Sequence, residues 1–146
     1  MLSDLLKQLL ASNFAYYLKA QMFHWNVEGP DFSQLHAFFA DIYGDAYSAV
    51  DKIAEYVRTL EEYAPGSFER FQELSQISGQ TKVPRARLML EELLADTEKM
   101  KSIVMEVFAA AQAEGREDIA NFMAERQDAH GKWAWQMKSF LKDARA

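Results

Sequence analysis

The chain has 146 residues, of which 49% are hydrophobic and 26% are charged, and this composition is typical of one globular domain with a substantial core. The net charge of −6 excludes a surface that is basic throughout, and the absence of cysteine excludes disulfides and thiolate metal sites. Only three prolines and six glycines are present, which favours an all-α fold. Residues 1–14 are amphipathic and do not form a continuous apolar run, so we expect no signal peptide and no membrane span.

The first predicted helix covers residues 2–27. Its leucines and aromatic residues recur every three to four positions, as they do on a helix with one apolar face. Ser3 or Asp4 is expected to cap its start, and Gly29-Pro30 ends it.

The second predicted helix covers residues 32–60. Asp31 is expected to cap it, with Gln34 as the partner in a capping box. Because the connection between the first two helices is very short, they should lie side by side and antiparallel.

A long crossover follows the second helix. Pro65-Gly66 breaks the helix, and residues 67–77 form a short amphipathic segment that ends at Gly79. The third helix is expected over residues 84–113 and the fourth over 117–141. The sequence therefore predicts an all-α four-helix bundle, residues 1–146 as one domain, with a short extra helix between the second and third helices.

The candidate metal ligands of the first two helices are two histidines and two acids one turn apart, which are His24, His36, Asp51 and Glu55. Imidazole and carboxylate suit iron, zinc or manganese. Asp51 and Glu55 lie one helical turn apart and can share an ion. His36 lies fifteen positions before Asp51, which is about 22 Å along a helix axis, so one chain cannot close the site.

Two antiparallel copies of the second helix, related by a two-fold axis, would bring these groups together. His36 of one subunit would then face Asp51 and Glu55 of the other. The two helices would cross near Gly44. A glycine inside a helix costs about 1 kcal/mol relative to alanine, and a close approach of two backbones is one reason to keep it.

This stretch resembles the Dps family, the mini-ferritins. The resemblance is carried by His24-Trp25-Asn26-Val27, Gly29, Phe32, Leu35-His36, Tyr43, Asp51 and Ile53-Ala54-Glu55. It continues in Pro65-Gly66-Ser67-Phe68 and in Arg126, His130, Lys132 and Trp135. The resemblance implies a ferritin-like bundle, with the two histidines from one subunit and the Asp/Glu pair from its two-fold mate.

The resemblance also implies the function of a ferroxidase. Such a protein oxidises Fe(II) with hydrogen peroxide or oxygen, stores ferric iron inside a hollow cytoplasmic dodecamer and protects against oxidative damage, and zinc can substitute for iron. Trp25 would lie beside the iron site and donate an electron. Glu117 and Asp118 would line a pore that admits Fe(II), although acids at a helix start also simply complement the helix dipole.

The sequence departs from the Dps pattern at Ala40, where an acidic residue is usual. Asp41 points about 100° away around the helix and is a poor substitute. An alternative reading is therefore a shell that binds one metal, iron or zinc, at each site and has weak or no ferroxidase activity. An intrachain di-iron centre is disfavoured because Gln21, Ser33 and Gln127 stand where a Glu-x-x-His motif needs glutamate.

A further alternative is a DNA-binding protection protein, which the net charge of −6 disfavours. DNA binding depends on cations that contact phosphates, and only Lys7 lies near the start of the chain. Lys82, Arg85 and Arg87 are expected to form a solvated basic face. His130 is expected to be a hydrogen-bonded core or interface residue rather than a metal ligand.

Overall fold

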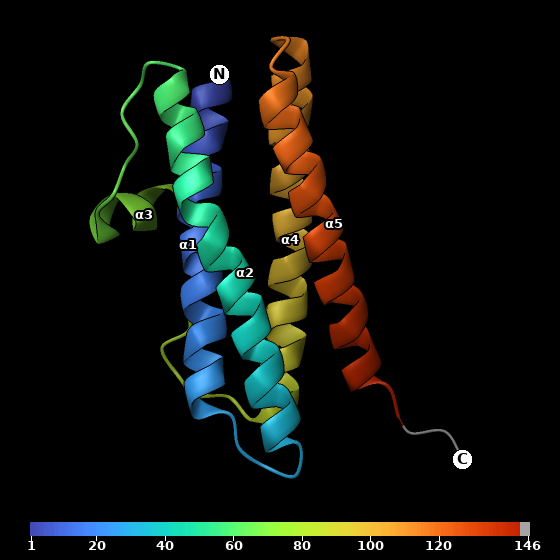
Figure 1. Cartoon of the computed structure of the whole chain (residues 1–146). Helices are drawn as coiled ribbons and strands as arrows, with labels where there is room; N and C mark the ends of the chain where they lie inside the picture. The colour runs from blue at the N-terminus through green and yellow to red at the C-terminus, as the bar shows by residue number, and fades with distance from the viewer. Residues whose placement is uncertain (144–146) are drawn as a thin grey trace.

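The structure is a computed structural model, and it describes residues 1–143. It contains four long helices and one short one, which are α1 (Leu2–Asn26), α2 (Phe32–Thr59), α3 (Phe68–Leu74), α4 (Ala86–Ala113) and α5 (Glu117–Leu141). Helices α1 and α2 form one antiparallel hairpin, α4 and α5 form another, and the crossover that carries α3 joins them (Figure 1). The predicted fold class is confirmed.

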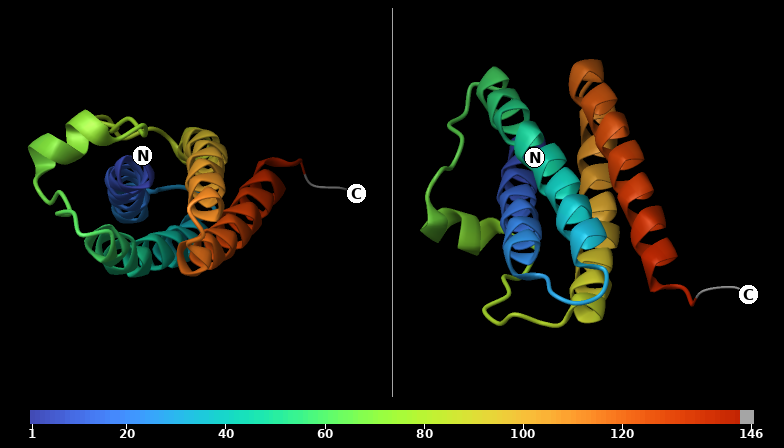
Figure 2. Two further views of the ribbon diagram at one scale, coloured as in Figure 1. Left: turned by 90° about the horizontal axis from the view of Figure 1, so that it is seen from above. Right: turned by 60° about the horizontal axis from the view of Figure 1, so that its bottom comes forward.

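Helix α1 occupies the centre of this arrangement. It packs against α2, α3 and α4, while α5 packs on α4. Seen from the end of the bundle, the crossover passes around the outside of α1 (Figure 2). Within residues 1–143, no helix combines the length and apolar character that a membrane crossing requires.

The start of α1 differs from the prediction. The helix begins at Leu2 with Met1 in the N-cap position, and neither Ser3 nor Asp4 caps it. Ser3 instead donates a hydrogen bond of 2.9 Å to Glu62 of the crossover. The helix begins at residue 2 as predicted, and Ser3 and Asp4 already lie within its first turn, so neither can occupy the N-cap position.

The predicted capping box of α2 is also wrong. Asp31 does occupy the N-cap position, but its φ of −100° and ψ of 23° are far from the extended backbone that a capping side chain needs. Its side chain makes no capping bond, and Gln34 accepts a bond of 3.3 Å from Ser33.

The crossover helix is shorter than predicted. Ser67 caps α3 by accepting a bond from the Arg70 amide, but the helix ends at Leu74. The side chain of Ser75 accepts from the Ile77 amide and donates to the Ile77 carbonyl, so these residues form a turn. Ile77 is nevertheless buried, as the apolar pattern predicted.

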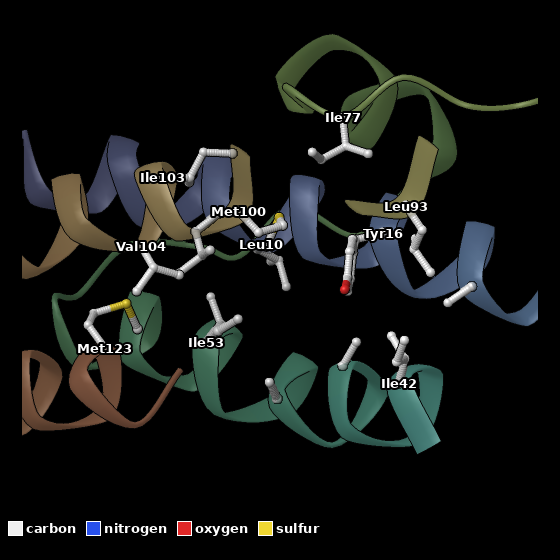
Figure 3. Packing of buried hydrophobic residues seen from close by; sticks show 14 of the residues in the cluster. Leu10, Tyr16, Ile42, Ile53, Ile77, Leu93, Met100, Ile103, Val104 and Met123 are labelled. Atoms are coloured by element: carbon white, nitrogen blue, oxygen red, sulfur yellow. The ribbon is translucent and has the colours of Figure 1, made fainter. Parts of the chain in front are cut away.

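The core is built from apolar side chains of all four long helices. Burying one such side chain contributes roughly 1.5–3 kcal/mol, so the bundle is stabilised mainly along this interior. Figure 3 shows part of it, including Leu10 and Tyr16 of α1, Ile42 and Ile53 of α2, Leu93, Met100, Ile103 and Val104 of α4, Met123 of α5, and Ile77 of the crossover.

One ion-pair network ties α1 to α4 inside the bundle. The Lys19 ammonium, 3% exposed, lies 2.8 Å from Glu92 and 2.7 Å from Asp96. Burial raises the pKa of Asp96 above its ordinary value, and Lys19 opposes this shift. Removing Lys19 would leave two partly buried carboxylates without their shared cation, which is costly.

A second network ties α2 to α5. Arg126 donates two hydrogen bonds, of 2.9 and 2.8 Å, to the two carboxylate oxygens of Asp45, and Trp133 donates a third of 3.0 Å. Burial alone would raise the pKa of Asp45, but the bonds and charge of Arg126 hold it below the ordinary value. This network fixes the pairing of the two hairpins.

His130 lies next to this second network. It is 1% exposed and packs edge-on against Tyr16 at 5.3 Å, so its expected place in the core is confirmed. The expected hydrogen bond is wrong, because neither ring nitrogen has a partner among residues 1–143. Burial, followed by the charge of Arg126, lowers the pKa of His130 to about 3, so the ring is neutral at ordinary pH.

Candidate metal centre

His24 and His36 come together where α1 ends and α2 begins. Their rings stack with centroids 3.8 Å apart and planes 19° apart. The Nδ1 atom of His24 lies 2.7 Å from the carbonyl oxygen of His36, and the Nδ1 atom of His36 lies 2.7 Å from the carbonyl oxygen of His24. The short connection between the two helices permits this reciprocal contact.

These two contacts determine which ring nitrogen carries the proton in a neutral imidazole. A carbonyl oxygen can only accept, so each Nδ1 must carry the proton and donate it. In the neutral imidazole the lone pair is then on Nε2, which is the arrangement that metal-binding histidines use. Both histidines are half-buried, and in this tautomer each Nε2 atom can accept a hydrogen bond or bind a metal.

Aromatic neighbours restrict the two imidazoles further. Phe32 stacks on His36 with ring centroids 5.0 Å apart, and Tyr43 meets His24 edge-on at 5.2 Å. Trp25, the expected electron donor, is 61% exposed. The backbone carbonyls and Tyr43 were not predicted as parts of the site, since main-chain acceptors leave no signature in a sequence.

The carboxylates lie elsewhere on the chain. Asp51 and Glu55 are exposed on α2, one turn apart and far beyond the end that carries His36. Among residues 1–143, no three side chains of His, Asp or Glu are close enough to hold an ion. A single chain therefore brings the two histidines together but does not bring the acids to them, as the spacing along α2 predicts.

The surface of α2 beside these acids is open and apolar. A groove of about 560 Å³ runs between α1, α2 and the crossover. Val50 and Ala54, which flank Asp51 in the helix, line it together with Phe68, whose side chain is 78% exposed. Gly44 is exposed too, and a Cβ there would meet nothing within 4 Å.

Ala40 lies one turn after His36 on α2 and is half-buried. Its methyl group offers no ligand oxygen. Asp41 is exposed, and no cluster of metal-binding side chains within residues 1–143 includes it. The position of the usual acid therefore has no evident replacement in the described part of the chain.

The proposed pore acids differ from each other. Asp118 accepts two hydrogen bonds from Arg116, of 3.0 and 2.8 Å, and these bonds lower the pKa of its carboxyl to about 2. Arg116 also donates to Thr59 at 3.1 Å, so the start of α5 is tied to the end of α2. Glu117 is exposed. We did not predict the role of Arg116, although its opposite charge two residues before Asp118 was a signal.

Comparison with known proteins identifies the family. Residues 3–146 match the Ferritin-like domain family. An uncharacterized low temperature-induced protein of Nostoc is 31% identical over 141 residues, covering 95% of this chain and 79% of the relative. The DNA protection during starvation protein 2 of Bacillus anthracis is 25% identical, covering 94% of each chain.

A solved structure agrees with these sequence relatives. The DPS protein of Vibrio cholerae, described as a member of a broad superfamily of ferritin-like diiron-carboxylate proteins, is 27% identical. It superposes with a TM-score of 0.92 over 97% of this chain and 89% of that protein. The chain therefore belongs to the ferritin-like family and, within it, to the Dps mini-ferritins.

Proposed function

We propose that this chain is a ferroxidase subunit. In this proposal, a hollow homo-oligomer of about twelve subunits oxidises Fe(II), stores the ferric product inside and limits oxidative damage. The observation that carries the proposal is the reciprocal bonding of His24 and His36, which leaves both Nε2 atoms free to bind metal.

Asp51 and Glu55 of the partner subunit complete the proposed site. Two imidazole nitrogens with two carboxylates suit Fe(II), and zinc is expected to compete for the same ligands. The apolar groove beside Asp51 and the open surface at Gly44 support a second copy against this face of α2, because burial of such a surface favours association.

The site would bind Fe(II) as its substrate. Each iron gives up one electron, and hydrogen peroxide or oxygen accepts it. The half-buried histidines and the aromatic rings of Phe32 and Tyr43 would keep water partly away from the ion. Trp25 remains the electron donor that the resemblance implies.

A second candidate function follows from Ala40. The shell would then hold one metal at each site, iron or zinc, with weak or no ferroxidase activity. Two closely spaced cations need more carboxylate charge than Asp51 and Glu55 supply, and Ala40 supplies none. Iron loading separates this candidate from the first.

A subunit-mixing experiment tests the shared site. His24→Ala and Asp51→Ala should each abolish metal binding when expressed alone. In a mixed dimer, the histidines of the Asp51→Ala subunit face the intact acids of the His24→Ala subunit, so one site of the two should bind Fe(II) again. Co-expressed and separately purified variants can be compared by calorimetric titration with zinc and by Fe(II) oxidation.

The control for this experiment is a mixture of His24→Ala with His36→Ala. In that mixture every site lacks one histidine, so no intact site can form. Recovery of binding in the control, or no recovery in the first mixture, would contradict a site shared between subunits. Light scattering of the unmodified protein should show a large oligomer near twelve subunits.

A further inference from the structure

A chain of aromatic rings leads away from His24. Tyr43 of α2 meets the His24 ring at 5.2 Å, and Tyr17 of α1 meets Tyr43 at 6.2 Å. Tyr47 of α2 lies 5.0 Å from Tyr17 by ring centroids. Three tyrosine rings from two helices therefore contact one another in sequence, beginning at His24, a proposed metal ligand.

The far end of this chain lies near the other half-site. Tyr47 and Asp51 are one turn apart on the same face of α2. In the proposed two-fold dimer, His24 belongs to one iron site, whereas Asp51 of the same subunit belongs to the symmetry-related site. The tyrosines therefore run from one site of the dimer towards the other.

We propose that Tyr43, Tyr17 and Tyr47 form an electron relay between the two iron sites of a dimer. This inference rests on the proposed function. The relay would supply an electron that each site lacks. Hydrogen peroxide needs two electrons for reduction to water, but a site that holds one Fe(II), because Ala40 replaces the usual acid, supplies only one. Trp25, which the resemblance implies as an electron donor, is 61% exposed and makes no ring–ring contact within residues 1–143, so it provides no path between the two sites.

In the first step of the relay, hydrogen peroxide accepts one electron from Fe(II) and one from the phenol of Tyr43, and its O–O bond breaks. The phenolic proton and one solvent proton complete two water molecules. The products are Fe(III) and one tyrosyl radical.

The second step returns the tyrosine to its starting state. The radical passes from Tyr43 through Tyr17 to Tyr47, where Fe(II) at the second site donates an electron. A solvent proton then restores the phenol. In total, two Fe(II), one peroxide and two protons give two Fe(III) and two water molecules, with no hydroxyl radical released.

The surroundings of the phenols suit this role. Tyr17 donates a hydrogen bond of 2.6 Å to the amide oxygen of Gln21, and Tyr47 is 58% exposed, so a released proton reaches solvent. Burial raises the pKa of Tyr17, and the neighbouring phenols of Tyr47 and Tyr43 add to the shift. Tyr17 is therefore protonated before oxidation. Ring packing alone would be served equally well by phenylalanine.

The test uses tyrosine-to-phenylalanine variants, which keep the rings and remove the phenols. Assembled protein is loaded anaerobically with one Fe(II) per site and mixed with half an equivalent of hydrogen peroxide. Rapid-freeze electron paramagnetic resonance detects tyrosyl radicals, and a spin trap detects hydroxyl radical. The variants are Tyr43→Phe, Tyr17→Phe and Tyr47→Phe, and the matched control is Tyr63→Phe, which lies outside the relay and is 84% exposed in the unmodified chain.

We expect the unmodified protein and the control to show a transient tyrosyl radical and to consume one peroxide per two irons. Each relay variant should lose this stoichiometry and release hydroxyl radical, while zinc titration shows unchanged metal binding. Relay variants that match the control, a radical at Trp25 alone, or lost zinc binding in the variants would each overturn the relay. Absence of iron binding in the unmodified protein would instead remove the proposed function, and the relay with it.

Discussion

At the scale of single residues, the three histidines show how surroundings decide what the same side chain does. His24 and His36 each donate from Nδ1 to a carbonyl and keep a lone pair on Nε2. His130 is buried beside Arg126 with no hydrogen-bond partner among residues 1–143. The first two are prepared to bind a cation, and the third is placed where a positive charge is unfavourable.

His130 should make the protein less stable in acid. Its folded-state pKa of about 3 lies below the ordinary 6.5, so only the unfolded chain binds this proton between those values. The free energy of unfolding should therefore fall as pH drops below about 6.5, by up to ~1.4 kcal/mol per pH unit from this group, until pH approaches 3. Other groups facing the ring are Asp45, Lys101 and Arg126.

The variant His130→Leu tests this prediction by removing the titrating group. Urea unfolding at pH 7.5 and pH 5 should show a smaller loss of stability in the variant than in the unmodified protein. An equal loss in both proteins would show that other groups govern acid stability.

Ala40→Asp should strengthen the second metal position. An acid at residue 40 lies one turn from His36 and approaches Asp51 and Glu55 of the partner subunit, so it adds a ligand and a negative charge. We expect higher occupancy at that position and faster oxidation of Fe(II) by peroxide, measured by anomalous diffraction and stopped-flow absorbance. Ala37→Asp is the matched control, because residue 37 is exposed and points about 100° away from His36 around the helix. Two fully occupied irons in the unmodified protein would contradict the prediction.

At the scale of elements, helix α2 combines two roles. Its first turns hold His36 against the end of α1, and its middle carries the exposed acids and the groove that we assign to a partner. The ends of the four long helices followed from the apolar period to within about two residues, because burial of one face determines where a helix can lie. The capping residues could not be predicted in this way, because Asp31 has a backbone conformation that its residue type does not reveal.

The candidate site likewise has one feature that follows from sequence spacing and others that depend on the tertiary structure. The spacing of His36 and Asp51 along one helix was enough to predict that a single chain separates them. The carbonyl acceptors of the two imidazoles could not be predicted from the sequence, since every residue has a carbonyl and only the tertiary arrangement selects two of them. Arg116 was missed for a similar reason: its second partner, Thr59, belongs to another helix.

Gly44→Ala should separate helix stability from assembly. Alanine stabilises a helix interior by about 1 kcal/mol relative to glycine, and a Cβ at residue 44 meets nothing within 4 Å in the chain. If two α2 helices cross there, the added methyl group should weaken the dimer even though it favours the helix. Sedimentation velocity over a range of concentrations measures this effect. Gly131→Ala, at an equally open helical glycine of α5, should leave two-fold pairing unchanged.

At the scale of the whole molecule, charge limits the choice of partners. The net charge of −6 repels a polyanion, and several cations are already paired, including Lys7 with Glu62 and Lys19 with Glu92 and Asp96. The name of the Bacillus anthracis relative refers to DNA protection. Protection of DNA by removal of Fe(II) and peroxide requires no contact with DNA.

The assembled protein should therefore not bind duplex DNA at physiological salt and neutral pH. Phosphate binding depends on released counterions and so on clustered cations, and the net charge of −6 disfavours such binding. A gel-shift titration checks this, with a basic DNA-binding protein as the positive control. A robust shift at physiological salt would show that cations gather on one face of the shell despite the net charge.

His36 and the acids Asp51 and Glu55 lie far apart along α2, so the proposed site would form only when two subunits pair. Thermodynamic linkage then requires reciprocity: whatever factor pairing adds to the affinity for iron, iron adds to the affinity between the subunits. The assembled fraction then responds to the supply of metal. In a cell rich in Fe(II), a larger fraction of the existing subunits would therefore assemble into shells before any new protein is synthesised.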